Sequence, residues 1–207
     1  IWRKARLALE SRQTKATRQA VDIVAPEAAA ALTDILNNPE RYLSKQTPSA
    51  NHQQQELTLL ALIRWADGNP DSAAQALEER WSKHLTQAQR AWAWGAIGKQ
   101  AAQKLSSDAL SYFSRAKSGQ MSDEHLAWRA RAALRMNQWS DALQAIESMS
   151  QDAASESTWV YWRARALLQP GRTEPERQQA RELLQGIAGV RGFYELLAQE
   201  ELGLPIT

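Results

Sequence analysis

The five-residue sequence Trp-Arg-Ala-Arg-Ala occurs twice in the chain. The first copy begins at Trp128 and the second at Trp162, and Trp94 precedes Trp128 by the same distance along the chain. A second short sequence, Ser-Asp-Ala-Leu, begins at Ser107 and again at Ser140, so its two copies are almost as far apart as the tryptophans. A fixed period of about 34 residues indicates a row of similar structural units, in which each unit contacts chiefly its neighbours.

Each repeat joins a Trp-bearing segment to a segment that opens on Ser or Asp. This period is typical of tetratricopeptide repeats, in which two helices and a turn form one unit. The Leu-Gly and Tyr positions of that consensus are mostly missing, so we describe the units as tetratricopeptide-like. We predict an all-α fold, an α-superhelix of helical hairpins that forms a right-handed solenoid, with three structural repeat residues: Trp94, Trp128 and Trp162.

The composition also favours helices. Ala, Leu, Gln, Glu and Arg dominate, whereas the β-branched strand formers Val and Ile are scarce. Apolar residues recur at helical spacing nearly throughout, and we expect one helix to end at Gly68 and another to begin after Thr86 as its N-cap. The stretch 37–52 holds two prolines and several Asn and Ser residues, so it is expected to be a connector with one short helical turn.

The domain organisation follows from where the repeat is visible. We expect residues 1–50 to form an N-terminal helical segment, a truncated part of the superhelix, and residues 51–207 to form the helical-repeat superhelix. The chain opens within a helical pattern and does not begin with Met. We therefore expect it to be a piece of a longer protein that lacks its signal peptide.

Charge and cysteine usage exclude several classes of function. The chain has 25 basic and 23 acidic residues, a formal net charge of +2, which is close to balance and gives no argument for nucleic-acid binding. Cysteine is absent, which excludes disulfides and thiolate metal sites. No stretch approaches the roughly 18 consecutive apolar residues of a membrane-spanning helix.

No catalytic or metal-binding pattern stands out. The three histidines, His52, His84 and His125, are isolated, and we expect them to face solvent near helix ends. Adjacent carboxylates such as Glu78 and Glu79 point about 100° apart on a helix, so they cannot act on one substrate atom. We predict no catalytic residue, no metal site and no cofactor in this chain.

The helix expected around Trp128 is apolar on two sides. Ala130 and Ala133 share one side, Trp128 points another way, and Arg129 and Arg131 lie about 200° apart on the edges between them. A helix of this kind packs between neighbours. The arginine stems can cover apolar surface while their guanidinium groups reach water.

The segment 159–205 resembles the part of soluble lytic murein transglycosylases that directly precedes their catalytic domain. In that family a Trp/Tyr-Trp-Arg/Gln-Ala helix, here Tyr161–Ala164, precedes the helix of the last repeat. The stretch 127–149 also looks like the family's repeat unit. A further motif then leads toward the catalytic domain, and it reads here Gly192, Phe193, Tyr194, Leu197, Ala198, Leu202, Gly203 and Pro205.

The resemblance implies a specific activity for the parent protein. This family cleaves the β-1,4 bond between N-acetylmuramic acid and N-acetylglucosamine in peptidoglycan and forms a 1,6-anhydromuramoyl product without adding water. Its single catalytic glutamate lies in a lysozyme-like domain, in a Glu-Ser motif that a Gly-Leu-Met-Gln stretch follows. The pairs Glu10-Ser11, Glu147-Ser148 and Glu156-Ser157 have no such stretch after them. The chain is therefore expected to be the non-catalytic superhelical scaffold, ending at the junction to the catalytic domain.

Partners and site residues are likewise implied by the resemblance. Peptidoglycan glycan strands and the parent's own C-terminal catalytic domain are the expected partners, in the periplasm of a Gram-negative bacterium. The candidate glycan-binding residues, whose guanidinium groups would meet muropeptide carboxylates, are Arg129, Arg131, Arg163, Arg165 and Tyr161. Pairing of these arginines with Glu residues of adjacent helices is the alternative. A tetratricopeptide-like adaptor for protein–protein interaction is the alternative function.

Overall fold

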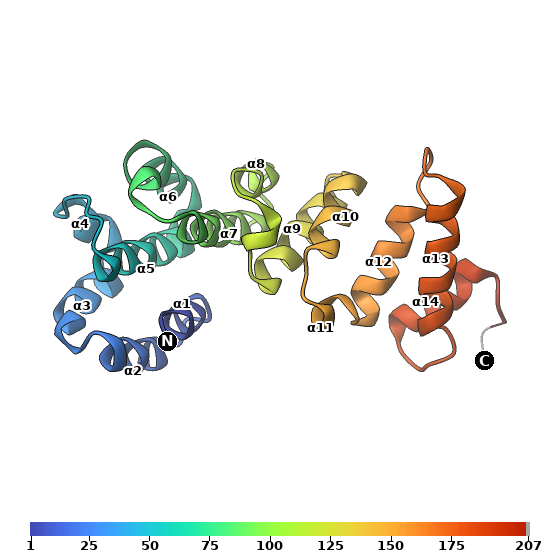
Figure 1. The fold of residues 1–207 in the computed structure, drawn as a ribbon, viewed down its shortest axis with the longest axis horizontal. Helices are drawn as coiled ribbons and strands as arrows, with labels where there is room; N and C mark the ends of the chain where they lie inside the picture. Colours follow the sequence, from blue (N-terminus) through green and yellow to red (C-terminus); the bar gives the residue numbers. More distant parts are fainter. Residues whose placement is uncertain (206–207) are drawn as a thin grey trace. The chain divides into compact units, whose positions relative to one another are not determined.

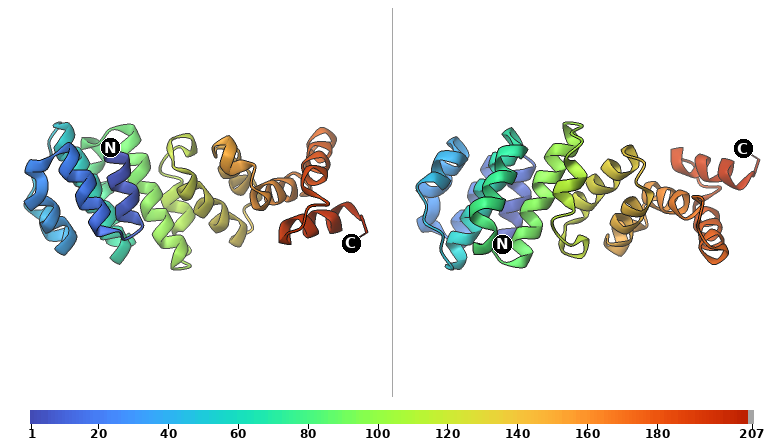
Figure 2. Two further views of the ribbon diagram at one scale, coloured as in Figure 1. Left: turned by 90° about the horizontal axis from the view of Figure 1, so that it is seen from below. Right: turned by 90° about the horizontal axis from the view of Figure 1, so that it is seen from above.

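A computed structural model describes residues 1–205 (Figure 1). Fourteen α-helices, joined by short turns, make up the fold, and no strand occurs among the described residues (Figure 2). The all-α prediction is thus confirmed. No helix in the described part of the chain is both long enough and apolar enough to cross a membrane.

The chain divides into two compact units, Ile1–Met121 and Ser122–Thr207, the second described as far as Pro205. The first unit contains eight of the helices: α1 (Trp2–Glu10), α2 (Thr14–Val24), α3 (Ala29–Asn37), α4 (Pro39–Ser44), α5 (His52–Gly68), α6 (Pro70–Ala76), α7 (Gln87–Gln103) and α8 (Ala109–Phe113). The second unit contains α9 (Asp123–Arg135), α10 (Trp139–Glu147), α11 (Gln151–Ala154), α12 (Ser157–Leu167), α13 (Glu174–Ile187) and α14 (Phe193–Leu202). A boundary at residue 50 and a junction after residue 207 stay predictions, and residues 206–207 lie outside the described part.

Helix α5 is the centre of the first unit. The stretch Leu57–Ile63 is apolar apart from Thr58, and all its residues are buried, so this helix is stable only when it is surrounded. Helices α1, α3, α4, α6 and α7 all pack against it. The N-terminal fifty residues therefore share one hydrophobic core with the helices that follow them.

Capping side chains set the starts of several helices in the first unit. Asn38, Asn51 and Asn69 each accept a hydrogen bond from a backbone N–H in the first turn of the helix that follows. Thr86 and Gln89 form a reciprocal capping box at the start of α7, which confirms the predicted N-cap. Proline is favoured at the first position of a helix, and Pro39 follows the cap Asn38. The predicted connector accordingly contains one short helix, α4.

Two segments of the first unit depart from simple helix. Helix α6 ends at Ala76 and is followed by a π-helical turn, Leu77–Trp81, and a 3-10 turn, Ser82–His84. Within the π-helical turn, Arg80 donates hydrogen bonds to the backbone carbonyls of Leu43 and Gln46.

Three helices end in the same left-handed turn. Arg12, Leu105 and Asn137 follow α1, α7 and α9 with φ of 59°, 59° and 57°. The residue after each of them donates a hydrogen bond from its backbone N–H to the carbonyl oxygen five residues earlier, for example Ser106 to Ala101 at 2.9 Å. This is the hydrogen bond that closes a helix C-terminus when glycine occupies the left-handed position. Here residues with side chains occupy that position in all three turns.

Replacement of Leu105 by glycine is expected to stabilise the chain by about 1 kcal/mol, because a left-handed conformation costs an ordinary residue roughly 1–2 kcal/mol and glycine almost nothing. Leu105 is 61% exposed, so little packing is lost with its side chain. Urea denaturation measures the change. Unchanged or lower stability of L105G would contradict this account of the turn.

The second unit packs its helices in sequence. Helix α9 packs on α10, α10 on α12, and α12 on both α13 and α14. Alanine dominates its core and allows the helices to approach closely, as at Ala164, Ala166, Ala180 and Ala198. The short α11 was not anticipated from the sequence. The repeat tryptophan Trp94 is buried on α7, whereas Trp128 on α9 and Trp162 on α12 are half-buried.

Candidate functional site

The predicted glycan-binding residues all lie in the second unit, on α9 and α12, but they occupy different environments. Arg129 on α9 is only 7% exposed. Its burial lowers the pKa of the guanidinium, and the negative charge of Asp141 on α10 partly offsets that effect. The guanidinium of Arg129 therefore acts inside the unit, between α9 and α10.

Arg131 is exposed and lies over indole rings. Its guanidinium carbon is 4.7 Å from the ring centroid of Trp128 and 5.4 Å from that of Trp159. Both distances fit cation–π attraction, which holds the side chain against α12 without a carboxylate. The two indoles leave the charge of Arg131 available to a ligand at the surface.

Arg165 belongs to a polar cluster with Tyr161 and Glu201. Its Nη1 donates a hydrogen bond to the Tyr161 hydroxyl at 2.9 Å and forms an ion pair with the Glu201 carboxylate of α14, also at 2.9 Å. Partial burial acts to lower the pKa of Arg165, but the Tyr161 hydroxyl and the Glu201 carboxylate outweigh it, so the pKa is raised. Pairing with Glu on an adjacent helix, the alternative for these arginines, thus occurs at Arg165, although its side chain remains 33% exposed.

A continuous aromatic row adjoins this cluster. Trp139 of α10 lies 6.3 Å from Trp162 of α12, measured between ring centroids. Trp162 in turn contacts Tyr161 at 5.2 Å and Tyr194 of α14 at 6.4 Å. Phe193 extends the row at 5.2 Å from Tyr194 and is 69% exposed. The row joins α10, α12 and α14. It includes the predicted repeat residue Trp162 and two residues of the family motif, Phe193 and Tyr194.

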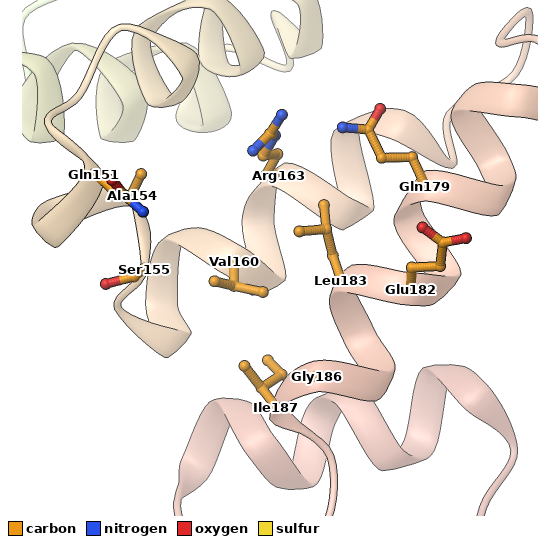
Figure 3. A pocket seen from close by; sticks show the side chains of 10 residues that line it. All are labelled: Gln151, Ala154, Ser155, Val160, Arg163, Gln179, Glu182, Leu183, Gly186 and Ile187. Carbon is orange, nitrogen blue, oxygen red and sulfur yellow. The ribbon is translucent and has the colours of Figure 1, made fainter.

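Arg163 faces a separate groove between α11, α12 and α13 (Figure 3). The groove has a volume of about 680 Å³ and is lined by apolar and polar side chains in turn: Val160, Leu183, Ile187, Ala154, Gly186, Gln151, Ser155, Arg163, Gln179 and Glu182. The Nε atom of Arg163 is buried and has no hydrogen-bond partner within the described residues. Arg163 and Arg165 thus lie on opposite edges of α12, as expected for positions about 200° apart.

The structure therefore brings Arg165 and Tyr161 together, places Arg131 beside indole rings, and leaves Arg163 in its own groove. Sequence reasoning missed the groove because its lining comes from three helices. It also missed the role of Glu201, since nothing in a helical pattern indicates which carboxylate will face Arg165.

Of the three histidines, His125 differs from expectation. It is fully buried at the first turn of α9, where its backbone N–H donates to the Ser122 hydroxyl. The expectation of a solvent-facing residue was wrong there, because the first turn of α9 is packed inside the fold. His52 is exposed and His84 half-buried. No cluster of three potential metal ligands occurs in the described part of the chain.

Comparison with known proteins gives one consistent result. An inactive mutant of lytic transglycosylase Slt from Pseudomonas aeruginosa matches with a TM-score of 0.67 and 26% identity, over 99% of this chain and 33% of that chain. The 70 kDa soluble lytic transglycosylase of Escherichia coli shares the fold with a TM-score of 0.66 at 18% identity, over 98% of this chain and 33% of that one. A complex of the 70 kDa soluble lytic transglycosylase with bulgecin A matches with a TM-score of 0.66 at 20% identity and the same coverage.

The chain matches no protein-family model and no curated protein sequence. It spans about a third of the length of the solved enzymes that it matches. The resemblance seen in the sequence is nevertheless confirmed: over nearly its whole length, this chain is similar to the superhelical region of the soluble lytic transglycosylases.

Proposed function

We propose that this chain is the non-catalytic superhelical scaffold of a soluble lytic transglycosylase that cleaves peptidoglycan to 1,6-anhydromuropeptides during cell-wall turnover. The observation that carries the proposal is the similarity to the Pseudomonas aeruginosa enzyme, which extends over 99% of this chain and only 33% of that one. The tetratricopeptide-like helical pairs would hold the catalytic domain of the same protein. The periplasm of a Gram-negative bacterium is the proposed location.

The second unit supplies the proposed contact with glycan strands. Arg131 and Arg165 offer guanidinium groups that aromatic rings hold in place, on α9 and α12. The indole of Trp162 is half-buried and offers apolar surface of the kind that packs against sugar rings, next to the polar edge formed by Arg165. Tyr161 is buried and would act by orienting Arg165 through its hydroxyl.

Purified peptidoglycan sacculi test both parts of this proposal. We expect the 207-residue chain to co-sediment with sacculi and to release no soluble anhydromuropeptides, measured by chromatography of the supernatant. Binding by the double variant Arg131→Gln/Arg165→Gln is expected to weaken at least about tenfold, because each lost charge-assisted contact is worth about 1.5–3 kcal/mol.

The double variant Arg135→Gln/Arg181→Gln is the matched control. It removes the same charge from the same unit, from an exposed residue of α9 and from a residue of α13 that pairs with Glu174. An equal loss of binding in the control would mean that only net charge matters and would contradict a defined contact. Release of anhydromuropeptides by this chain would contradict the non-catalytic role.

A further inference from the structure

The groove between α11, α12 and α13 combines an apolar floor with two opposite charges. Val160 of α12 and Leu183 and Ile187 of α13 provide its apolar surface. Figure 3 shows the guanidinium of Arg163 on the same side of the groove as the side chains of Gln179 and Glu182. This combination is typical of a site for a small amphiphilic ligand, in which a few polar groups fix the orientation.

Arg163 differs from Arg165, two positions further along the same helix. Arg165 is hydrogen-bonded to Tyr161 and paired with Glu201. Arg163 has neither a hydrogen bond nor an ion pair among the described residues, although its Nε atom is buried. A buried donor without an acceptor is unfavourable, and such groups in a folded protein call for an explanation. The guanidinium of Arg163 lines the groove, and its terminal N–H groups also have no acceptor among the described residues, so a ligand oxygen in the groove can accept hydrogen bonds from them.

Glu182 provides the complementary charge. It lines the groove from α13 and forms no ion pair with any described residue, including Arg163. A cation and an anion that face one cavity but do not pair with each other can bind the two ends of a zwitterionic ligand. A guanidinium fork suits a carboxylate, and the Glu182 carboxylate suits an ammonium group.

We infer that this groove binds a short peptide that carries a terminal carboxylate, alanine-sized side chains and an ammonium group. The carboxylate would accept hydrogen bonds from Arg163, the methyl groups would contact Val160 and Leu183, and the ammonium group would lie near Glu182. The peptides that cross-link glycan strands in peptidoglycan have this chemistry. In this respect the inference rests on the proposed function, and it adds a site for the peptide beside the site for the glycan.

The test is calorimetric titration of the full chain with the synthetic peptide N-acetyl-Lys-D-Ala-D-Ala and with its C-terminal amide. The free acid is expected to bind, and the amide to bind at least tenfold more weakly. Arg163→Gln is expected to weaken binding of the acid at least tenfold. Glu182→Gln should weaken binding of the same peptide, but not of its Nε-acetylated form, which has no ammonium group.

Arg181→Gln is the matched control, because it removes a guanidinium from α13 outside the groove. Circular dichroism checks that each variant is folded, and Arg163→Lys, which keeps the charge without the fork, should bind with intermediate affinity. Equal binding of acid and amide, no binding by the unaltered chain, or an equal effect of Arg181→Gln would overturn the inference.

Sacculi binding separates this inference from the proposed function. If the chain binds sacculi but not the free peptide, the peptide site is wrong and the scaffold proposal stands. If it binds the peptide with the expected dependence on Arg163 but does not bind sacculi, the site is supported and the glycan contact is wrong.

Discussion

Replacement of Arg6 by methionine is expected to lower the free energy of unfolding by about 3–5 kcal/mol, because it leaves the buried carboxylate of Glu56 without its cation. Arg6 Nε donates to Glu56 at 3.1 Å, and Nη2 donates to the other carboxylate oxygen. The Glu56 side chain is 2% exposed, and Gln89 also donates to it at 3.2 Å. Urea denaturation with fluorescence detection measures the loss.

Two further variants make this result specific. The double variant Arg6→Met/Glu56→Leu removes both charges and is expected to be more stable than Arg6→Met alone, because no buried carboxylate remains. Arg12→Met is the matched control. It breaks a second ion pair to α5, with Asp67, but the Arg12 side chain is 69% exposed, so solvent replaces the partner and little change is expected. A large effect of Arg12→Met, or equal stability of R6M and the unaltered chain, would refute this interpretation.

Replacement of Phe113 by alanine is expected to cost about 3–5 kcal/mol of stability, because it leaves a cavity at the contact between α7 and α8. Phe113 is fully buried. Its ring lies against Gly98 of α7 so closely that a Cβ atom added there would be 2.7 Å from the ring. Gly98→Ala should therefore also destabilise, by about 1–3 kcal/mol through overpacking.

Gly98→Ala should lower the stability of the unaltered chain but raise the stability of the Phe113→Ala variant. When Phe113 is alanine, a methyl group at Gly98 no longer meets a ring, and the higher helix propensity of alanine contributes about 0.8–1 kcal/mol. Phe113→Ala/Gly98→Ala is then expected to be more stable than Phe113→Ala alone, in the same urea assay. Simple additivity of the two single changes would show that Gly98 and Phe113 do not interact as described.

Much of the helical architecture could be predicted from the sequence because it depends on local signals. The end of α5 follows from Gly68, and the start of α7 follows from Thr86. Hydrophobic spacing predicted the long helices. In each case neighbouring residues along the chain carry the information.

The candidate site could be predicted only in part, because it depends on contacts between helices. Arg163 and Arg165 belong to the same repeated five-residue sequence, yet Arg163 lies in an open groove and Arg165 pairs with Glu201. The burial of His125 and the π-helical turn before Ser82 are also tertiary effects. Helical periodicity places a residue on a face, and only the neighbouring helices decide what that face meets.

The asparagine caps of the first unit have a consequence for chemical ageing. Deamidation of asparagine usually begins when the backbone nitrogen of the next residue attacks the side-chain amide, which requires an N–H group. Asn38 and Asn69 are followed by Pro39 and Pro70, which have no such group, so this route is closed at both caps. Asn51 is followed by His52 and keeps the route open, so on prolonged storage the start of α5 is the first of these three helix termini to acquire a new negative charge.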